Sequence, residues 1–202
     1  LFDISNAKGK ISKRGTLKTK GYVSDRWKMH ESGNTFFAIT SSGWNEDNLI
    51  ESFDITDKDN ITKIGELIFM QNQQLYGTKF DNNKMYAVTY YRQDPLHVID
   101  ITDPANMTEL GQLAVPGWSN YLEVQNDRIF AVGVDDTDGF KAKLSMYNVA
   151  DPTNPIEMGS ISFGTAYSSS TASYDWKAFR IISDLNLILL PVNSYSSDYY
   201  HY

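Results

Sequence analysis

Three aspartates in one short stretch are the clearest candidates for ligand chemistry in this sequence. The stretch DDTDGF (135–140) contains Asp135, Asp136 and Asp138, and Gly139 allows the chain to turn sharply there. Closely spaced carboxylate oxygens are the ligands that Ca²⁺ prefers, although the stretch lacks the later Glu of an EF-hand loop. It therefore predicts a Ca²⁺ site, with a solvated acidic loop as the alternative.

Residues that commonly perform catalysis form no familiar motif. The three histidines, His30, His97 and His201, are far apart, and the chain has no cysteine. Ser119 in GWSNY (117–121) lacks the second glycine of a nucleophile elbow, and no phosphate-binding glycine loop is present. We therefore assign no catalytic residue and expect a protein that is not an enzyme.

A corner of fixed composition recurs four times along the chain. In each copy an apolar strand ends in Asp or Asn, a short polar turn follows, and the next strand contains a glycine. The aligned residues are Asp3, Asp54, Asp100 and Asn148, followed by Gly15, Gly65, Gly111 and Gly159. The glycines lie 50, 46 and 48 residues apart, so the corner belongs to a repeat unit.

Short strands fill the sequence between the corners. In the second unit we place them at 62–69, 75–80, 84–90 and 96–101, where β-branched and aromatic residues dominate between polar turns. Four strands in a repeat of about 40–50 residues are typical of a β-propeller blade. We expect the corner to lead from the outermost strand of one blade to the innermost strand of the next. Its aspartates should bond backbone amides rather than act as acids or bases.

The predicted fold is all-β, a propeller of four-stranded antiparallel blades in a single domain over residues 1–202. The predicted units are 10–56, 62–102, 108–150 and 156–193, with 1–5 as an outer strand. Two interpretations stay open. The chain is a fragment of a larger propeller, which we favour, or a four-bladed ring that residues 1–5 close.

Alternating strand directions bring the longer loops of every blade to one edge, and these loops are rich in aromatic residues. The full set is Tyr22, Trp27, Trp44, Tyr90, Tyr91, Arg92, Trp118, Tyr121, Tyr167, Tyr195, Tyr199 and Tyr200. About half should be buried, with Trp118 and Tyr121 the first among them. Tyr, Trp and Arg dominate binding hot spots. The predicted binding residues are Trp27, Trp44, Tyr90, Tyr91, Arg92, Tyr199 and Tyr200.

Two stretches resemble a known family. MYAVTYYRQDPLHVIDITDPANMTELGQLAVPGWSNYLEV (85–124) and KLSMYNVADPTNPIEMGSISFG (143–164), followed by ASYDWKAFRI (172–181), are similar to secreted bacterial and archaeal β-propeller domains distantly related to WD-type repeats. Ile61 and Met107 depart from the second proline usual in such corners, and Pro155 keeps it. The resemblance implies a propeller fold and export. It implies no catalytic residue.

These observations favour an exported, non-enzymatic binding or scaffold module whose aromatic loop face binds a protein or polysaccharide. Its expected location is extracellular, at the cell surface or periplasmic. A net charge of −7 argues against a nucleic-acid partner, and the longest apolar run, LNLILLPV (185–192), is too short for membrane insertion. The alternatives are a metal-assisted hydrolase or lyase at the propeller axis and a structural surface-layer component.

Overall fold

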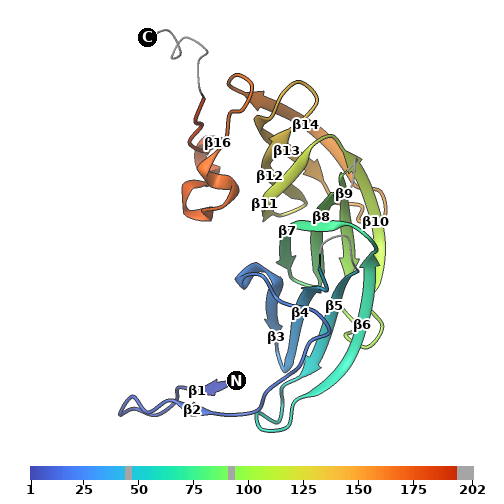
Figure 1. Cartoon of the computed structure of the whole chain (residues 1–202), viewed down its shortest axis with the longest axis vertical. Coiled ribbons are helices and arrows are strands. Elements are labelled where there is room, and N and C mark those ends of the chain that lie inside the picture. Colours follow the sequence, from blue (N-terminus) through green and yellow to red (C-terminus); the bar gives the residue numbers. More distant parts are fainter. Residues whose placement is uncertain (44–46, 91–93, 195–202) are drawn as a thin grey trace. The chain divides into compact units, whose positions relative to one another are not determined.

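The computed structural model describes residues 1–43, 47–90 and 94–194 (Figure 1). Its contacts divide the chain into two compact units, which are described separately. The first unit contains Leu1–Gln74 and Asp100–Thr108, and the second contains Leu75–Ile99 and Glu109–Tyr202. Helices in the described part are short turns, and none is long and apolar enough to cross a membrane.

Most strands belong to three four-stranded sheets, in which neighbours in sequence are also neighbours in space (Figure 1). The first sheet contains β3 (Met29–Ser32), β4 (Thr35–Ser41), β5 (Asn48–Asp54) and β6 (Thr62–Met70). The second contains β7 (Gln74–Asp81), β8 (Lys84–Tyr90), β9 (Asp94–Asp100) and β10 (Thr108–Val115). The third contains β11 (Trp118–Gln125), β12 (Arg128–Asp135), β13 (Lys141–Asn148) and β14 (Ile156–Phe163). The predicted strand positions and four-stranded sheets are confirmed.

Two further strand pairs and four short 3-10 helices complete the described elements. β1 (Phe2–Asp3) pairs with β2 (Ser12–Lys13), and β15 (Arg180–Ile182) pairs with β16 (Leu187–Leu189). The 3-10 helices are η1 (Arg26–Lys28), η2 (Thr171–Ser173), η3 (Trp176–Ala178) and η4 (Ser183–Leu185). The structure is therefore all-β apart from single helical turns.

The predicted role of the corner was wrong. Asp54 lies opposite Thr62, and Asn148 lies opposite Ile156, so each corner closes a hairpin inside one sheet. The sheets run over 29–70, 74–115 and 118–163, and the predicted units 10–56, 62–102, 108–150 and 156–193 were displaced by one strand. Likewise, residues 1–5 supply the strand before a corner and not an outer strand.

Hydrogen bonds within the corners explain the hairpins. Asp100 Oδ1 accepts from the backbone N–H of Thr102 at 2.8 Å, and Asp103 Oδ1 accepts from that of Ala105 at 2.9 Å. The same two bonds recur at Asn148 and Asp151. Two successive turns of this kind reverse the chain within seven residues, which brings the next strand back beside the last. The prediction that these carboxylates bond backbone amides is confirmed.

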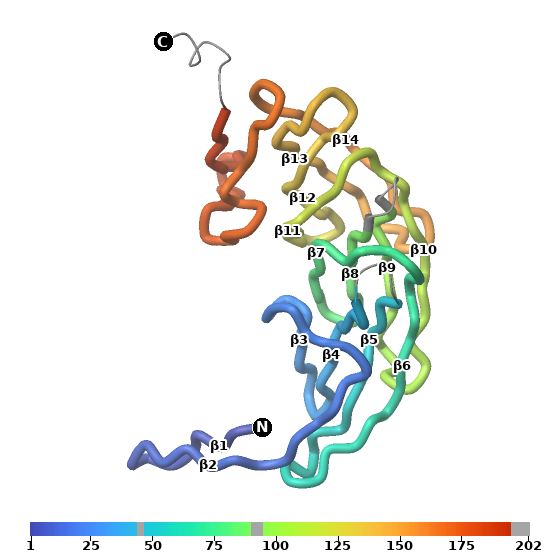
Figure 2. Tube along the Cα trace, in the orientation of Figure 1, coloured from blue at the N-terminus to red at the C-terminus, as the bar shows by residue number. Residues whose placement is uncertain are grey.

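The core of the second unit lies between the second and third sheets. Tyr86 and Val98 from the second sheet pack with Leu122, Ile129 and Tyr147 from the third, and all are at most 2% exposed. Side chains alternate across a strand, so one face of each sheet supplies this core and the other faces away. Figure 2 traces the up-and-down path of β11 to β14 that creates these faces.

Candidate functional site

Loops and turns are segregated to opposite edges of each sheet. Antiparallel strands place the β12–β13 loop and the β14–β15 segment at one edge of the third sheet, while the two-residue β11–β12 turn and the corner lie at the other. The long connections therefore share an edge, as the sequence indicates. We call it the loop edge.

Four aromatic rings from separate segments form a continuous row at the loop edge of the second unit. Ring centroids are 6.0 Å apart between Tyr76 and Trp118, 5.9 Å between Trp118 and Phe140, and 6.1 Å between Phe140 and Tyr167. Tyr76 lies on β7 and Trp118 on β11, while Phe140 and Tyr167 lie in loops. Pairs at these distances attract one another beyond their burial alone. We call these four residues the aromatic row.

Exposure increases along the aromatic row. Tyr76 and Trp118 are half-buried, Phe140 is 48% exposed and Tyr167 is 71% exposed. Tyr167 also has φ +65°, a left-handed conformation that costs a bulky residue energy. Such a cost persists where the surroundings impose it, and it is frequent at binding sites. The inner rings thus support two outer rings that are open to a partner.

The structure describes only part of the predicted aromatic set. Trp27 lies in η1, half-buried, with the Arg26 guanidinium 5.0 Å from its ring centroid. Tyr90 ends β8, and its side chain is not described. The other predicted binding residues lie outside the described ranges, and these are Trp44, Tyr91, Arg92, Tyr199 and Tyr200.

Tyr76 and Phe140 of the aromatic row were not predicted. Tyr76 was read as an ordinary strand residue, and Phe140 as the end of the acidic loop. The sequence offered one signal for Phe140, because this residue directly follows Gly139 and glycine favours turns. In the structure Gly139 has φ +72° and turns the chain there. Trp118 and Tyr121, expected to be packed, are both half-buried. Tyr121 lies edge-on to Phe179 at 5.5 Å.

The acidic loop lies beside the aromatic row but does not gather its three carboxylates. Asp135 accepts hydrogen bonds from Ser162 Oγ at 2.6 Å and from Thr137, and these bonds lower its pKa to about 2. Asp138 pairs with Lys141 Nζ at 2.8 Å, and Asp136 is exposed. Over the described residues, no group of three His, Cys, Asp or Glu side chains is arranged to hold a metal. Calcium binding here stays a prediction.

A buried polar cluster in the second sheet has the order of groups found in a catalytic triad. His97 Nε2 lies 3.2 Å from Thr89 Oγ1, and His97 Nδ1 lies 2.6 Å from Glu109 Oε1. A hydroxyl, an imidazole and a carboxylate in this order can activate the hydroxyl as a nucleophile. However, Thr89 and His97 are both 0% exposed, and the three side chains come from adjacent strands β8, β9 and β10.

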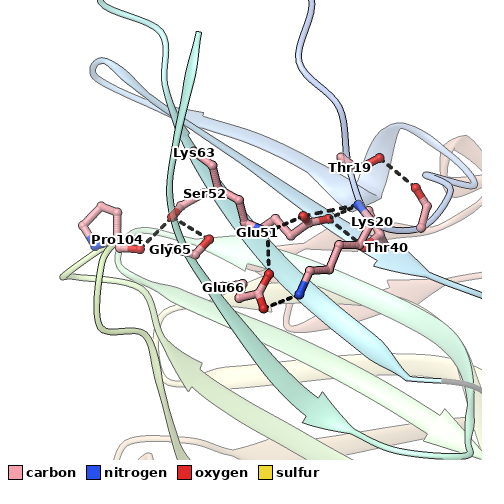
Figure 3. Close-up of polar contacts among 10 residues, drawn as sticks. Thr19, Lys20, Thr40, Glu51, Ser52, Lys63, Gly65, Glu66 and Pro104 are labelled. Carbon is pink, nitrogen blue, oxygen red and sulfur yellow. Dashed lines mark hydrogen bonds and ion pairs between the residues drawn. The ribbon is translucent and has the colours of Figure 1, made fainter.

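The first sheet has a related cluster at the equivalent positions (Figure 3). Glu51 on β5 takes the place of His97, Thr40 that of Thr89, and Lys63 that of Glu109. Glu51 is 0% exposed and accepts from Thr40 Oγ1 at 3.0 Å and Lys63 Nζ at 2.7 Å, and also from the backbone N–H of Lys20. This shared position, which we call the polar slot, joins the second, third and fourth strands of a sheet. The same slot therefore holds different polar groups in the two sheets.

The comparisons with known proteins agree with this architecture. The family model described as "Beta propeller domain" matches residues 1–202. The chain belongs to this family. A curated protein of Methanocaldococcus jannaschii, described as uncharacterised, is 30% identical over 89% of this propeller chain and 29% of its own length. An uncharacterised protein of Archaeoglobus fulgidus is 24% identical over 94% of this chain and 30% of its own length.

The propeller chain spans about 30% of the length of these curated relatives. Among solved structures, a europium-containing methanol dehydrogenase is similar to 67% of this chain and to 24% of its own chain, with a TM-score of 0.49 and 12% identity. The family membership establishes the β-propeller fold, and its sheets are blades. Neither curated relative is described as binding a particular ligand.

Proposed function

We propose that this propeller is an exported, non-enzymatic binding module whose aromatic row engages a protein partner. The observation that supports the proposal is the pair of outer rings. Phe140 and Tyr167 are 48% and 71% exposed, yet both are held in a ring-to-ring series that ends on β-strands. Rings held in this way lose little side-chain entropy on binding, as hot-spot residues must.

Geometry favours a polypeptide over a polysaccharide. Successive planes in the aromatic row are inclined by 37°, 55° and 45°, so the row offers no flat platform for a sugar ring. A charged pair, Asp138 and Lys141, borders the row. An aromatic centre with a polar border is the usual anatomy of a protein interface.

Affinity capture tests this proposal. Wild type and the double variant Phe140→Ala/Tyr167→Ala are immobilised at equal density and exposed to a surface extract of the producing organism, and captured proteins are quantified. We expect the double variant to lose about tenfold or more of the specific capture. Tyr174→Ala is the matched control, since Tyr174 is a 77% exposed tyrosine of the same β14–β15 segment outside the row.

Equal capture by all three proteins would contradict the proposal. In a parallel arm, wild type is titrated with soluble xylan, chitosan and cellulose oligomers. Saturable binding of one of these, abolished in the double variant, would assign the aromatic row to a glycan and overturn the protein partner.

A further inference from the structure

Two corners end in a motif that the aromatic row does not involve. The stretches NIT (60–62) and NMT (106–108) both read Asn-x-Thr, which is the acceptor motif for N-linked glycans. Thr62 is the first residue of β6, and Thr108 is the first residue of β10. Each motif therefore joins a corner to the fourth strand of its sheet.

Common ancestry of the repeats explains the asparagine but not the complete motif. The corner of the third sheet also contains an asparagine, Asn154, but Pro155 and Ile156 follow it, and neither residue is compatible with the motif. In all three corners the backbone N–H of this asparagine donates to the carbonyl of the Asp three positions earlier. Most residues can make such a backbone turn bond. The turn thus requires neither the asparagine side chain nor the threonine.

The asparagine is exposed although the rest of the corner is packed. A Cβ added to Gly65 would lie 2.5 Å from the Pro104 carbonyl oxygen, so the corner of the second sheet is in tight contact with β6. Asn106, two residues after Pro104, is nevertheless exposed. Asn60, at the equivalent position of the first sheet, is exposed as well. Exposure at this position therefore belongs to the repeat.

The two asparagines differ in what holds their side chains. Asn106 Nδ2 donates to Asp103 Oδ2 at 2.8 Å, and the next residue, Met107, is only 6% exposed. Within the part of the chain that the structure describes, the side chain of Asn60 has no hydrogen-bond partner, and Ile61 is half-buried. Nδ2 is the atom to which an N-linked glycan attaches. A glycan on Asn106 must fit around an existing hydrogen bond, whereas a glycan on Asn60 meets no such bond.

We propose that Asn60 carries an N-linked glycan and that Asn106 is modified less completely. The donor is a phosphate-activated oligosaccharide, which a host transferase delivers. Asn60 Nδ2 forms a bond to the anomeric carbon of the sugar, the bond from that carbon to the phosphate oxygen breaks, and the proton from Nδ2 leaves with the phosphate. The proposal rests on the export in the proposed function, because this motif is modified in secreted proteins.

The place of Asn60 in the first sheet is compatible with binding at the loop edge. The β5–β6 corner, which contains Asn60, lies at the same edge of the sheet as the tight β3–β4 turn. The long β4–β5 connection lies at the other edge, which is the loop edge. A glycan is bulky and solubilising, so at the corner edge it leaves the loop edge of its sheet accessible.

Mass spectrometry of the chain purified from the surface fraction of the producing organism tests the proposal. Cleavage after Lys58 and Lys63 releases residues 59–63, in which Asn60 is the one asparagine. We expect this peptide to carry an oligosaccharide in wild type and to lose it completely in Asn60→Gln and in Thr62→Val. Thr62→Ser is the matched control and should keep the glycan, because serine also completes the motif.

Several outcomes would overturn the proposal. Wild type recovered from the cell surface with an unmodified Asn60 would overturn the glycan and leave the proposed binding module standing. A glycan that persists in Asn60→Gln would assign the modification to the Thr62 hydroxyl. Fuller modification of Asn106 than of Asn60 would show that the free side chain does not decide the site. Wild type found only inside the cell would instead overturn the export on which both proposals rest.

Discussion

The polar slots of the first and second blades hold opposite chemistry in the same geometry. In the first blade a carboxylate, Glu51, lies on the third strand and an ammonium, Lys63, on the fourth. In the second blade an imidazole, His97, takes the third strand and a carboxylate, Glu109, the fourth. A threonine hydroxyl on the second strand completes both clusters.

This difference shows that the repeat fixes the position of a polar cluster but not its charge. Buried polar groups must be hydrogen-bonded, and either arrangement satisfies that requirement across three strands. In the third blade the equivalent residues are Gly133, Ser145 and Glu157, so the second-strand hydroxyl is lost and a buried serine hydroxyl replaces the buried ionisable group. The triad-like order in the second blade is therefore one of several residue combinations found at this position.

The largest loss of stability should come from removing the buried carboxylate of the first blade. Glu51→Ala leaves the hydroxyl of Thr40 and the Lys20 N–H without their acceptor and Lys63 without its inner partner. Lys63 is one third exposed and keeps Glu66, so the cost comes chiefly from the two donors left without an acceptor, at about 1–3 kcal/mol each. Urea unfolding should show this loss. Glu66→Ala is the control, because Glu66 pairs with Lys63 nearer the surface and should cost no more than about 1 kcal/mol.

The equivalent substitution in the second blade should cause a smaller loss of stability. His97→Ala removes the group between Thr89 and Glu109, but Glu109 is one third exposed and can bond to water instead. We expect a loss of about 2–3 kcal/mol from the lost imidazole hydrogen bonds and the space left behind. Urea unfolding measures it alongside Glu51→Ala. A loss larger than that of Glu51→Ala would reverse the ranking of the two slots.

Alkaline pH should distinguish the two slots without any change to His97. Partial burial acts to lower the pKa of Lys63, but its hydrogen bonds to Glu51 and Glu66 outweigh this and raise the pKa above 10.5. A raised lysine pKa stabilises the fold below pH 10.5, and that stabilisation is lost as pH rises through the folded-state pKa. Melting temperatures of wild type and Lys63→Met, followed from about pH 8 to about pH 12, should therefore converge at the alkaline end. Parallel curves would show that Lys63 contributes no pH-dependent stability.

Much of the fold could be predicted from the sequence, because strands and turns are local signals. β-Branched residues between Asn- and Asp-rich turns located nearly every strand, and the recurring glycines gave the repeat. The grouping of strands into blades was wrong because it depends on which strands pair across a seven-residue corner, and composition does not record pairing. The polar slot could not be recognised either, since Thr40, Glu51 and Lys63 each lie beside another polar residue, as exposed residues often do. The aromatic row depends on how separate loops pack, so only Trp118 and Tyr167 were anticipated.

The smallest loss of stability should occur in the third blade, where Gly133 lacks the second-strand hydroxyl and Ser145 replaces the buried ionisable group. Glu157 has the position of Glu109 but lies exposed on β14, opposite Tyr147 in the strand register. Substitutions at exposed positions without such partners usually change stability by no more than about 0.5 kcal/mol. Urea unfolding of Glu157→Ala should stay within that range. A loss comparable to that of His97→Ala would mean that the third blade also relies on this position, and the slot would then be a property of every repeat rather than of two.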